Sequence, residues 1–321
     1  MENSSTATMC LPGMVGTEKA KIGTWWWALH GIFEKSHDIT PERALDLLVQ
    51  NHVSEIYLDV SGMYPDGEKD FDPLAASFSC VRHFIRLCNT LGIRVSALTG
   101  ASRDRCKTWI DPTRGYPEIQ SFLNKIEFFN ALAEPDERFT AVHVDVEPHS
   151  IQGFQENRSL YFSQYALLME YICKRAHQAG LQSETDICAD FRETDVVRVN
   201  GEEKKLLDAA FDSCDTIVVM AYRHSAERQM EFGTSRYIPY AEKYNTRLMV
   251  GCETLPPCDD LSIDDIPPSI TYSTVGWKTM VEEQEKLQNI MQKTTTADFG
   301  ISVHHVHSWE KLVSGDGYIR K

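Results

Sequence analysis

Short apolar runs alternate with longer amphipathic segments along this chain, and this alternation constrains the fold more than any other feature. Eight runs rich in apolar and β-branched residues span 21–29, 53–61, 94–100, 140–148, 184–191, 215–223, 247–255 and 300–309. Most are nearly continuous in hydrophobicity, as strands are when helices cover the sheet. Strand and helix patterns in alternation predict right-handed crossovers and a parallel sheet. Eight such units in 321 residues predict an α/β protein with a closed (β/α)8 TIM barrel.

The segments between these runs carry the start and stop patterns of helices. They span 41–48, 78–91, 116–132, 159–179, 202–211, 230–244 and 276–292. Thr40 stands at the capping position of the first, followed by Pro41, whose missing N–H costs nothing at the first helical position. Neither GxGxxG nor GxxxxGK[ST] is present, so an open nucleotide-binding sheet is not indicated. The long connection 253–274 contains four prolines, and we expect it to lie over the mouth of the barrel.

Charge and composition restrict the partners. The chain has 32 Lys and Arg against 47 Asp and Glu, and the net charge of −15 would repel a nucleic acid or an anionic membrane. No stretch approaches the 18 apolar residues of a membrane span, and residues 1–20 lack the pattern of a secretory signal. Nine cysteines without CxxC spacing favour reduced thiols. We therefore expect a cytoplasmic protein with a tail at 1–20 and one barrel domain at 21–321.

Acidic residues gather where the predicted strands end. Asp59 follows the second strand, Asp145 and Glu147 lie on the fourth, Asp190 on the fifth and Glu253 on the seventh. Catalytic groups of TIM barrels lie at the carboxyl ends of the strands. Because charged side chains in strands are costly to desolvate, five acids in corresponding positions favour a functional site over five separate structural roles.

The fourth strand gives the clearest pattern, in the run 141–149 with the sequence AVHVDVEPH. A period of two places His143, Asp145 and Glu147 on one face and the valines on the other. We expect the polar face to point into the barrel, because helices cover its outside. A carboxylate two residues before Glu147 can help to keep a proton on Glu147 near neutral pH, as a general acid requires.

This pattern resembles the chitinase-like family 18 glycoside hydrolases, which carry Asp-Gly-x-Asp-x-Asp-x-Glu on the fourth strand. The resemblance implies that Glu147 protonates the leaving oxygen and that Asp145 positions an acetamido group of the substrate. Residues 220–223, Met-Ala-Tyr-Arg, are similar to the family's Met-x-Tyr-Asp, so Tyr222 would orient the same group. Residues 300–304 are similar to the eighth-strand Gly-x-x-x-Trp.

The chain departs from that family at several motif positions. Thr140, Ala141 and His143 replace the first Asp, the Gly and the middle Asp, while Arg223 and His304 replace the sixth-strand Asp and the eighth-strand Trp. These departures leave open a second hypothesis, in which the barrel binds carbohydrate without cleaving it.

Glu253 allows another glycosidase mechanism. Retaining enzymes of the large clan with two catalytic glutamates place an acid/base after strand four and a nucleophile after strand seven, which would make Glu253 the nucleophile beside Glu147. An ion pair of Glu253 with Arg223 or Arg247 is the structural alternative. Aromatic side chains such as Trp27 can stack on sugar rings, which supports a carbohydrate substrate.

Histidines at strands four, six and eight allow a third hypothesis, a metal-dependent hydrolase or isomerase. They are His143, His149, His224, His304, His305 and His307. The leading prediction is a glycosidase without metal or other cofactor, acting on a small carbohydrate or glycoside, with Glu147, Asp145 and Glu253 as catalytic candidates. The predicted substrate-binding residues are Tyr222, Asp190, Asp59, Trp27, His143, His304 and Arg223.

Overall fold

Eight parallel strands form a closed barrel in the computed structural model, which describes residues 21–68, 72–258 and 266–315. Around the barrel the strands follow one another in the order β1-β12-β11-β10-β7-β6-β5-β2. Their bounds are β1 Lys21–Trp26, β2 Glu55–Asp59, β5 Arg94–Ala101, β6 Ala141–Val146, β7 Gln182–Cys188, β10 Thr216–Met220, β11 Arg247–Glu253 and β12 Phe299–His304. The (β/α)8 fold predicted from the sequence is confirmed.

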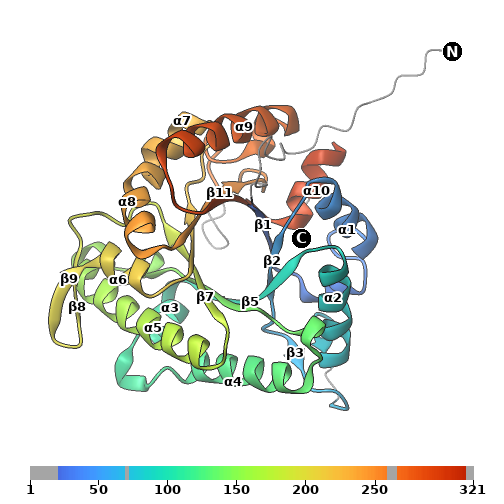
Figure 1. Ribbon diagram of the computed structural model, residues 1–321, viewed down its shortest axis with the longest axis horizontal. Helices are drawn as coiled ribbons and strands as arrows, with labels where there is room; N and C mark the ends of the chain where they lie inside the picture. Colours follow the sequence, from blue (N-terminus) through green and yellow to red (C-terminus); the bar gives the residue numbers. More distant parts are fainter. Residues whose placement is uncertain (1–20, 69–71, 259–265, 316–321) are drawn as a thin grey trace.

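Helices surround this barrel on its outer side (Figure 1). They are α1 Pro41–Gln50, α2 Phe78–Thr90, α3 Arg103–Trp109, α4 Pro117–Leu132, α5 Arg158–Gln178, α6 Leu206–Asp212, α7 Ala226–Gln229, α8 Ser235–Tyr244, α9 Trp277–Thr294 and α10 Val306–Ser314. As predicted, Thr40 caps α1, accepting a hydrogen bond from the backbone N–H of Arg43, and Pro41 takes the first position. No helix in the described ranges is long and apolar enough to cross a membrane. The cysteines described there are all free.

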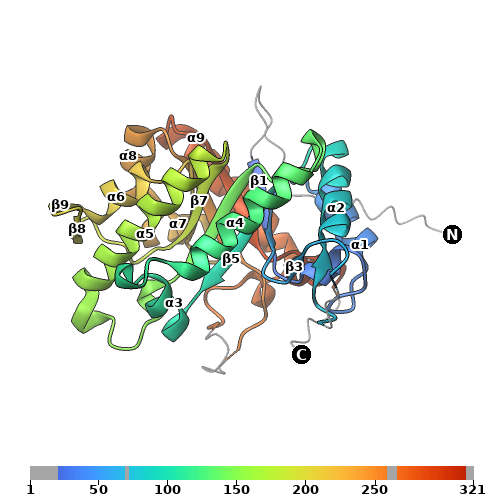
Figure 2. The ribbon, with the colours of Figure 1, turned by 90° about the horizontal axis from the view of Figure 1, so that it is seen from below.

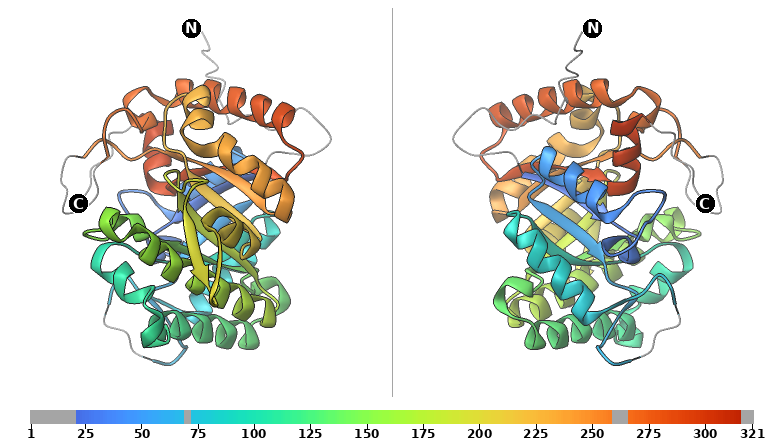
Figure 3. Two further views of the ribbon diagram at one scale, coloured as in Figure 1. Left: turned by 90° about the vertical axis from the view of Figure 1, so that its left-hand side faces the viewer. Right: turned by 90° about the vertical axis from the view of Figure 1, so that its right-hand side faces the viewer.

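Several expected elements differ from the structure in their type or bounds. Residues 202–211 were expected to be one helix, but Glu202–Lys205 forms strand β9, which pairs with β8, Val196–Val199, on the outside of the barrel (Figure 3, left). Asn200 and Gly201 both have positive φ, which is the geometry of a tight hairpin turn. The eighth strand was expected to run to Trp309, but it ends at His304, and Trp309 is buried on α10.

The inside of the barrel contains charged groups as well as apolar ones. Trp25, Tyr57, Leu98, Val218 and Met249 form a small apolar cluster there. Buried ion pairs lie beside this cluster, joining residues on β2, β5, β6, β7 and β11. They are Arg94–Glu55 at 2.6 Å, Arg94–Glu184 at 2.7 Å, Arg247–Glu55 at 3.3 Å, His143–Glu184 at 3.2 Å and His143–Asp186 at 3.0 Å.

His143 is the cation at the centre of this network. Its Nδ1 hydrogen-bonds to Glu184, its Nε2 faces Asp186, and its ring lies 4.1 Å from the ring centroid of Tyr57. Burial alone would lower the pKa of His143, but Asp186 and Glu184 outweigh it and raise the pKa to about 10. His143 is therefore charged at neutral pH and compensates two buried carboxylates.

This charge makes a testable contribution to stability. The folded pKa of His143, about 10, lies above its ordinary value of 6.5, so the contribution is complete below pH 6.5 and is lost as the pH rises toward 10. We expect His143→Gln to lower the free energy of unfolding by roughly 3–5 kcal/mol near pH 6. The difference from wild type should shrink as the pH approaches 10, as measured by denaturant unfolding across this range.

His83→Gln is the matched control, since His83 is exposed on α2. This variant should unfold like wild type at every pH. A stability difference for His143→Gln that stays constant from pH 6 to pH 10 would show that His143 is not charged in the folded protein.

Candidate active site

A cavity of about 1290 Å³ opens at the carboxyl ends of the barrel strands. Figure 2 shows α3 and the orange segment after β11 at this same end of the barrel. Leu255, Ile266 and Ile270, which belong to that segment, line part of the cavity wall. The predicted position of this long connection over the barrel mouth is therefore correct for its described residues.

Asp145 and Glu147 both line the cavity. The intervening valines belong to the core between barrel and helices, so the predicted alternation of the fourth strand, β6, is confirmed. The backbone of Glu147 is fixed, because its N–H donates to Ala101 and its carbonyl oxygen accepts from the hydroxyl of Ser150. Its side chain is 24% exposed, which leaves it accessible from the cavity.

His149 is a titratable neighbour of Glu147, with its Nε2 3.7 Å from a carboxylate oxygen. Burial lowers the pKa of His149 to about 4. His149 is therefore neutral at pH 7 and does not offset the charge of an ionised Glu147. It can accept or donate one hydrogen bond at the cavity wall.

Gly100 makes room for this arrangement. It pairs with Asp145 in the β5–β6 register, and a Cβ atom there would lie 2.9 Å from the carbonyl oxygen of Asp145 and 3.6 Å from the ring of Trp27. A side chain at this position would push β5 away from β6, while its contact with Trp27 would be an ordinary one. The glycine thus keeps an acidic strand and an aromatic side chain close together.

The hydroxyl of Tyr222 lies within the electrostatic influence of several acids of the cavity. Burial, followed by the charges of Glu253, Asp186, Asp145 and Glu147, raises its pKa well above the ordinary value. The hydroxyl therefore stays protonated and can donate a hydrogen bond at neutral pH. The ring stacks against His304, with the ring centroids 6.0 Å apart.

Glu253 lines the cavity, but its carboxylate is already engaged. Oε1 accepts the backbone N–H groups of Thr254 and Leu255, each at 2.7 Å, and Nδ1 of His304 lies 2.9 Å from Oε2. The indole N–H of Trp27 donates to Nε2 of His304 at 2.9 Å. Since an indole only donates, Nε2 of His304 must accept. His304 therefore carries its proton on Nδ1 and donates a hydrogen bond from it to Glu253. The geometry favours an orienting role for Glu253 over a nucleophilic one, and Glu253 forms no ion pair with Arg223 or Arg247 in the described structure.

Asp186 lines the same cavity and was missed in the sequence analysis. Its Oδ2 accepts the indole N–H of Trp25 at 2.9 Å, and His143 contacts its other oxygen from below. The alternation of Glu184, Asp186 and Cys188 along β7 was visible in the sequence and places all three on the inward face. The sequence analysis instead extended this strand to 191 and selected Asp190.

Three predicted substrate-binding residues do not line the cavity. Asp190 follows the end of β7 and pairs with Arg158 and Arg192, while Asp59 accepts hydrogen bonds from the backbone and hydroxyl of Ser61. His143 lies deeper, inside the barrel. By contrast, Trp27, Tyr222, His304 and Arg223 do line it.

His304, His305 and His307 lie near one another, with ring centroids 5.3 Å apart for the first pair and 5.8 Å for the second, but two of them have other partners. His304 is held by Glu253 and Trp27, and Nδ1 of His305 accepts the backbone N–H of His307 at the start of α10. Within the described ranges, no three His, Cys, Asp or Glu side chains are arranged to hold a metal ion. No donor set in this part of the chain therefore supports the metal-dependent hypothesis.

Comparison with solved structures finds this architecture in glycoside hydrolases. A GH20 module of the pneumococcal exo-β-D-N-acetylglucosaminidase StrH superposes with a TM-score of 0.55 at 8% identity, over 92% of this chain and 84% of that one. The group IV chitinase of Ostrinia furnacalis gives 0.53 at 11%, over 93% and 96%. The GH18 chitinase ChiB of Flavobacterium johnsoniae gives 0.50 at 13%, over 92% of each chain.

This chain has the fold of these glycoside hydrolases. No protein-family model and no curated protein matches its sequence. The expected resemblance to the glycoside hydrolase barrel is thereby confirmed at the level of the fold. Identities of 8–13% carry no residue roles from those proteins to this one.

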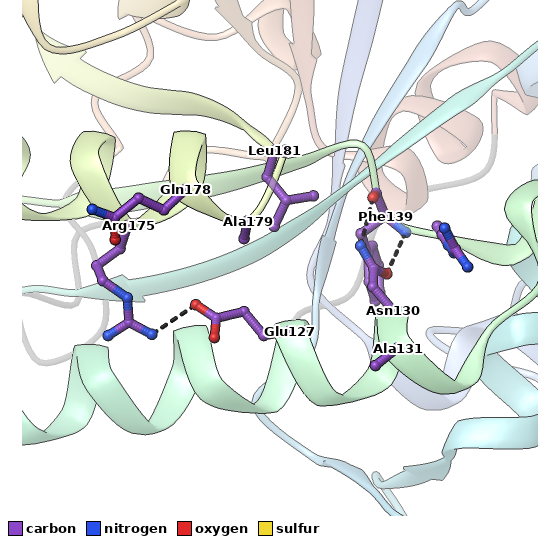
Figure 4. A pocket seen from close by; sticks show the side chains of 10 residues that line it. Glu127, Asn130, Ala131, Phe139, Arg175, Gln178, Ala179 and Leu181 are labelled. Carbon is purple, nitrogen blue, oxygen red and sulfur yellow. Dashed lines mark hydrogen bonds and ion pairs between the residues drawn. The ribbon is translucent and has the colours of Figure 1, made fainter.

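A second, smaller cavity of about 550 Å³ lies between α4, α5 and the segments that lead into β6 and β7. Its polar side chains are largely paired with one another, as Figure 4 shows for Arg175 with Glu127 and for Asn130 with the backbone of Phe139. It lies where the chain enters β6 and β7, at the end of the barrel opposite to Asp145 and Glu147, so it is not the candidate active site.

The orienting role of Glu253 can be tested with Glu253→Gln. An amide cannot accept from both backbone N–H groups and from His304 without bringing two donors face to face, so we expect a loss of roughly 1–3 kcal/mol in unfolding free energy. Thermal and denaturant unfolding measure this loss. If the protein hydrolyses a glycoside, Glu253→Gln should reduce the turnover of that glycoside only as far as it displaces the side chain of Trp27.

A nucleophilic Glu253 would behave differently. Glu253→Ala would then abolish turnover, and added azide would restore it by attacking the anomeric carbon in place of the carboxylate. Rescue by azide would contradict the orienting role.

Proposed function

We propose that this protein is a glycoside hydrolase in which Glu147 is the general acid. The observation that carries the proposal is the position of Asp145 and Glu147 at the carboxyl end of β6, inside a cavity large enough for a sugar chain. Trp27 and Tyr222 line the same cavity and offer faces on which sugar rings stack. The glycosidase names of the structural neighbours support the same class of reaction.

In this mechanism Glu147 begins the reaction protonated. It gives its proton to the glycosidic oxygen as the bond from that oxygen to the anomeric carbon breaks, so the leaving group departs as a neutral alcohol. The resulting carboxylate then takes a proton from the water that adds to the anomeric carbon. Glu147 is thereby restored, and the sum of the steps is hydrolysis.

The other cavity residues hold the sugar and the charge that develops on it. The carboxylates of Asp145 and Asp186 lie on the cavity side of β6 and β7, where they can stabilise positive charge at the anomeric carbon. The protonated hydroxyl of Tyr222 can donate to a substituent of the same sugar. The Glu253–His304 pair fixes the indole of Trp27 at the wall.

A barrel that binds carbohydrate without cleaving it is the second candidate. It is favoured by the two histidines at positions of the family 18 motif, which contact other side chains of the barrel. His143 contacts Asp186, and His304 accepts a hydrogen bond from Trp27. Both candidates use the same cavity. They differ in whether Glu147 transfers a proton to the glycosidic oxygen of the bound sugar.

Glu147→Gln separates them. The amide keeps the shape but cannot donate a proton of comparable acidity, so we expect turnover of aryl and oligosaccharide glycosides to fall by about 10²–10⁴-fold with little change in binding. The measurement is a kinetic comparison across a substrate panel. Glu156→Gln, which makes the same change at an exposed residue nearby, should retain wild-type turnover.

Equal turnover by Glu147→Gln and wild type would eliminate the proton-donor role. Binding of an oligosaccharide by both proteins with hydrolysis by neither would support the non-catalytic candidate instead.

A further inference from the structure

Arg223, in the wall of the cavity, forms no ion pair with the acidic residues that the structure describes. It follows β10 and lines the same cavity as Asp145 and Glu147. Its Nη1 donates to the carbonyl oxygen of Tyr222 at 2.6 Å, and its guanidinium carbon lies 3.5 Å from the ring centroid of Phe232. In the described parts of the chain, no carboxylate forms an ion pair with Arg223, although acidic residues outnumber basic ones by 47 to 32.

Other arginines of the barrel are compensated. Arg94, Arg158 and Arg247 each hold two carboxylates, and none of the three lines the cavity. Arg223 differs from these three arginines in two ways. It has no carboxylate partner among the residues that the structure describes, and it lines the cavity.

The surroundings of Arg223 disfavour its positive charge but hold its guanidinium group in a fixed orientation. Burial, and then the neighbouring charge of Arg228, lowers the pKa of Arg223, and an anion in the cavity would reverse this effect. The ring of Phe232 and the carbonyl of Tyr222 hold the guanidinium in one orientation. A planar guanidinium held in this way still has N–H groups that can bind two oxygens of one anion.

Another cationic side chain contributes to the cavity from a helix. Arg105, on α3 after β5, also lines it and stacks on Trp109 with its guanidinium carbon 4.6 Å from the ring centroid. The wall thus combines acids with arginines, so a ligand that carries negative charge on one part only can find a partner there.

Building on the proposed function, we propose that the sugar chain bound in this cavity carries an anionic substituent, a carboxylate or a sulfate, that Arg223 recognises. Arg223, which replaces the sixth-strand Asp of the family 18 motif, would then determine the specificity for a charged sugar. Both substituents present oxygens at the spacing of the guanidinium N–H groups.

Binding measurements on matched oligosaccharide pairs test this proposal. We would titrate a chitooligosaccharide against its 6-O-sulfated form, and a cello-oligosaccharide against its C6-carboxylate form, in the Glu147→Gln background to prevent turnover. The charged member of at least one pair should bind about tenfold more tightly, and the preference should weaken with added salt. The pair that shows the preference identifies the substituent.

Variants at position 223 attribute the preference to this side chain. Arg223→Gln should remove the preference, while Arg223→Lys should keep part of it, because lysine retains the charge but not the planar pair of donors. Arg228→Gln is the matched control, since Arg228 is an exposed arginine on α7 that does not line the cavity, and it should leave the preference intact. Thermal unfolding would verify that each variant is folded.

Equal binding of charged and neutral members, or a preference that survives Arg223→Gln, would overturn the inference and leave the glycosidase proposal standing. Failure of every oligosaccharide to bind would overturn both.

Discussion

The acidic interior of this barrel depends on the charge of His143. Two carboxylates, Glu184 and Asp186, are almost fully buried in the barrel, where water solvates their charge poorly. His143 sits between them and Arg94 holds Glu184 from the other side, so that the pKa of Glu184 falls to about 2 in spite of burial. Asp186 thus lies at the cavity wall with the cation of His143 beside it.

The same arrangement brings a carboxylate to the cavity wall in a chain that departs from the family 18 motif. His143 stands where that motif has an acid, but it is paired with Asp186 on the neighbouring strand, so a carboxylate still lies next to Asp145. On the eighth strand, His304 replaces an aromatic residue and instead holds Trp27 against the cavity. In both places a histidine contacts a neighbouring residue that lines the cavity.

The sequence predicted the fold well because the relevant patterns are local. Each strand–helix unit shows its own hydrophobic period, and the inward face of β6 follows from strict alternation over 141–147. The site was harder to predict, since it depends on where each strand ends and on pairs between strands. Asp190 was expected at the site because the fifth strand was drawn three residues too long, and the partners of Glu253 come from the backbone and from β12, which no local pattern reveals.

The central claim is that the side chain of Glu147 meets the glycosidic oxygen of a bound sugar. A crystal structure of the Glu147→Gln variant with an intact oligosaccharide tests this claim directly. The account predicts a glycosidic oxygen within about 3 Å of the side-chain amide at position 147, with a sugar ring against Trp27. An oligosaccharide bound elsewhere, or one whose glycosidic oxygens all lie beyond hydrogen-bond reach of that position, would contradict it.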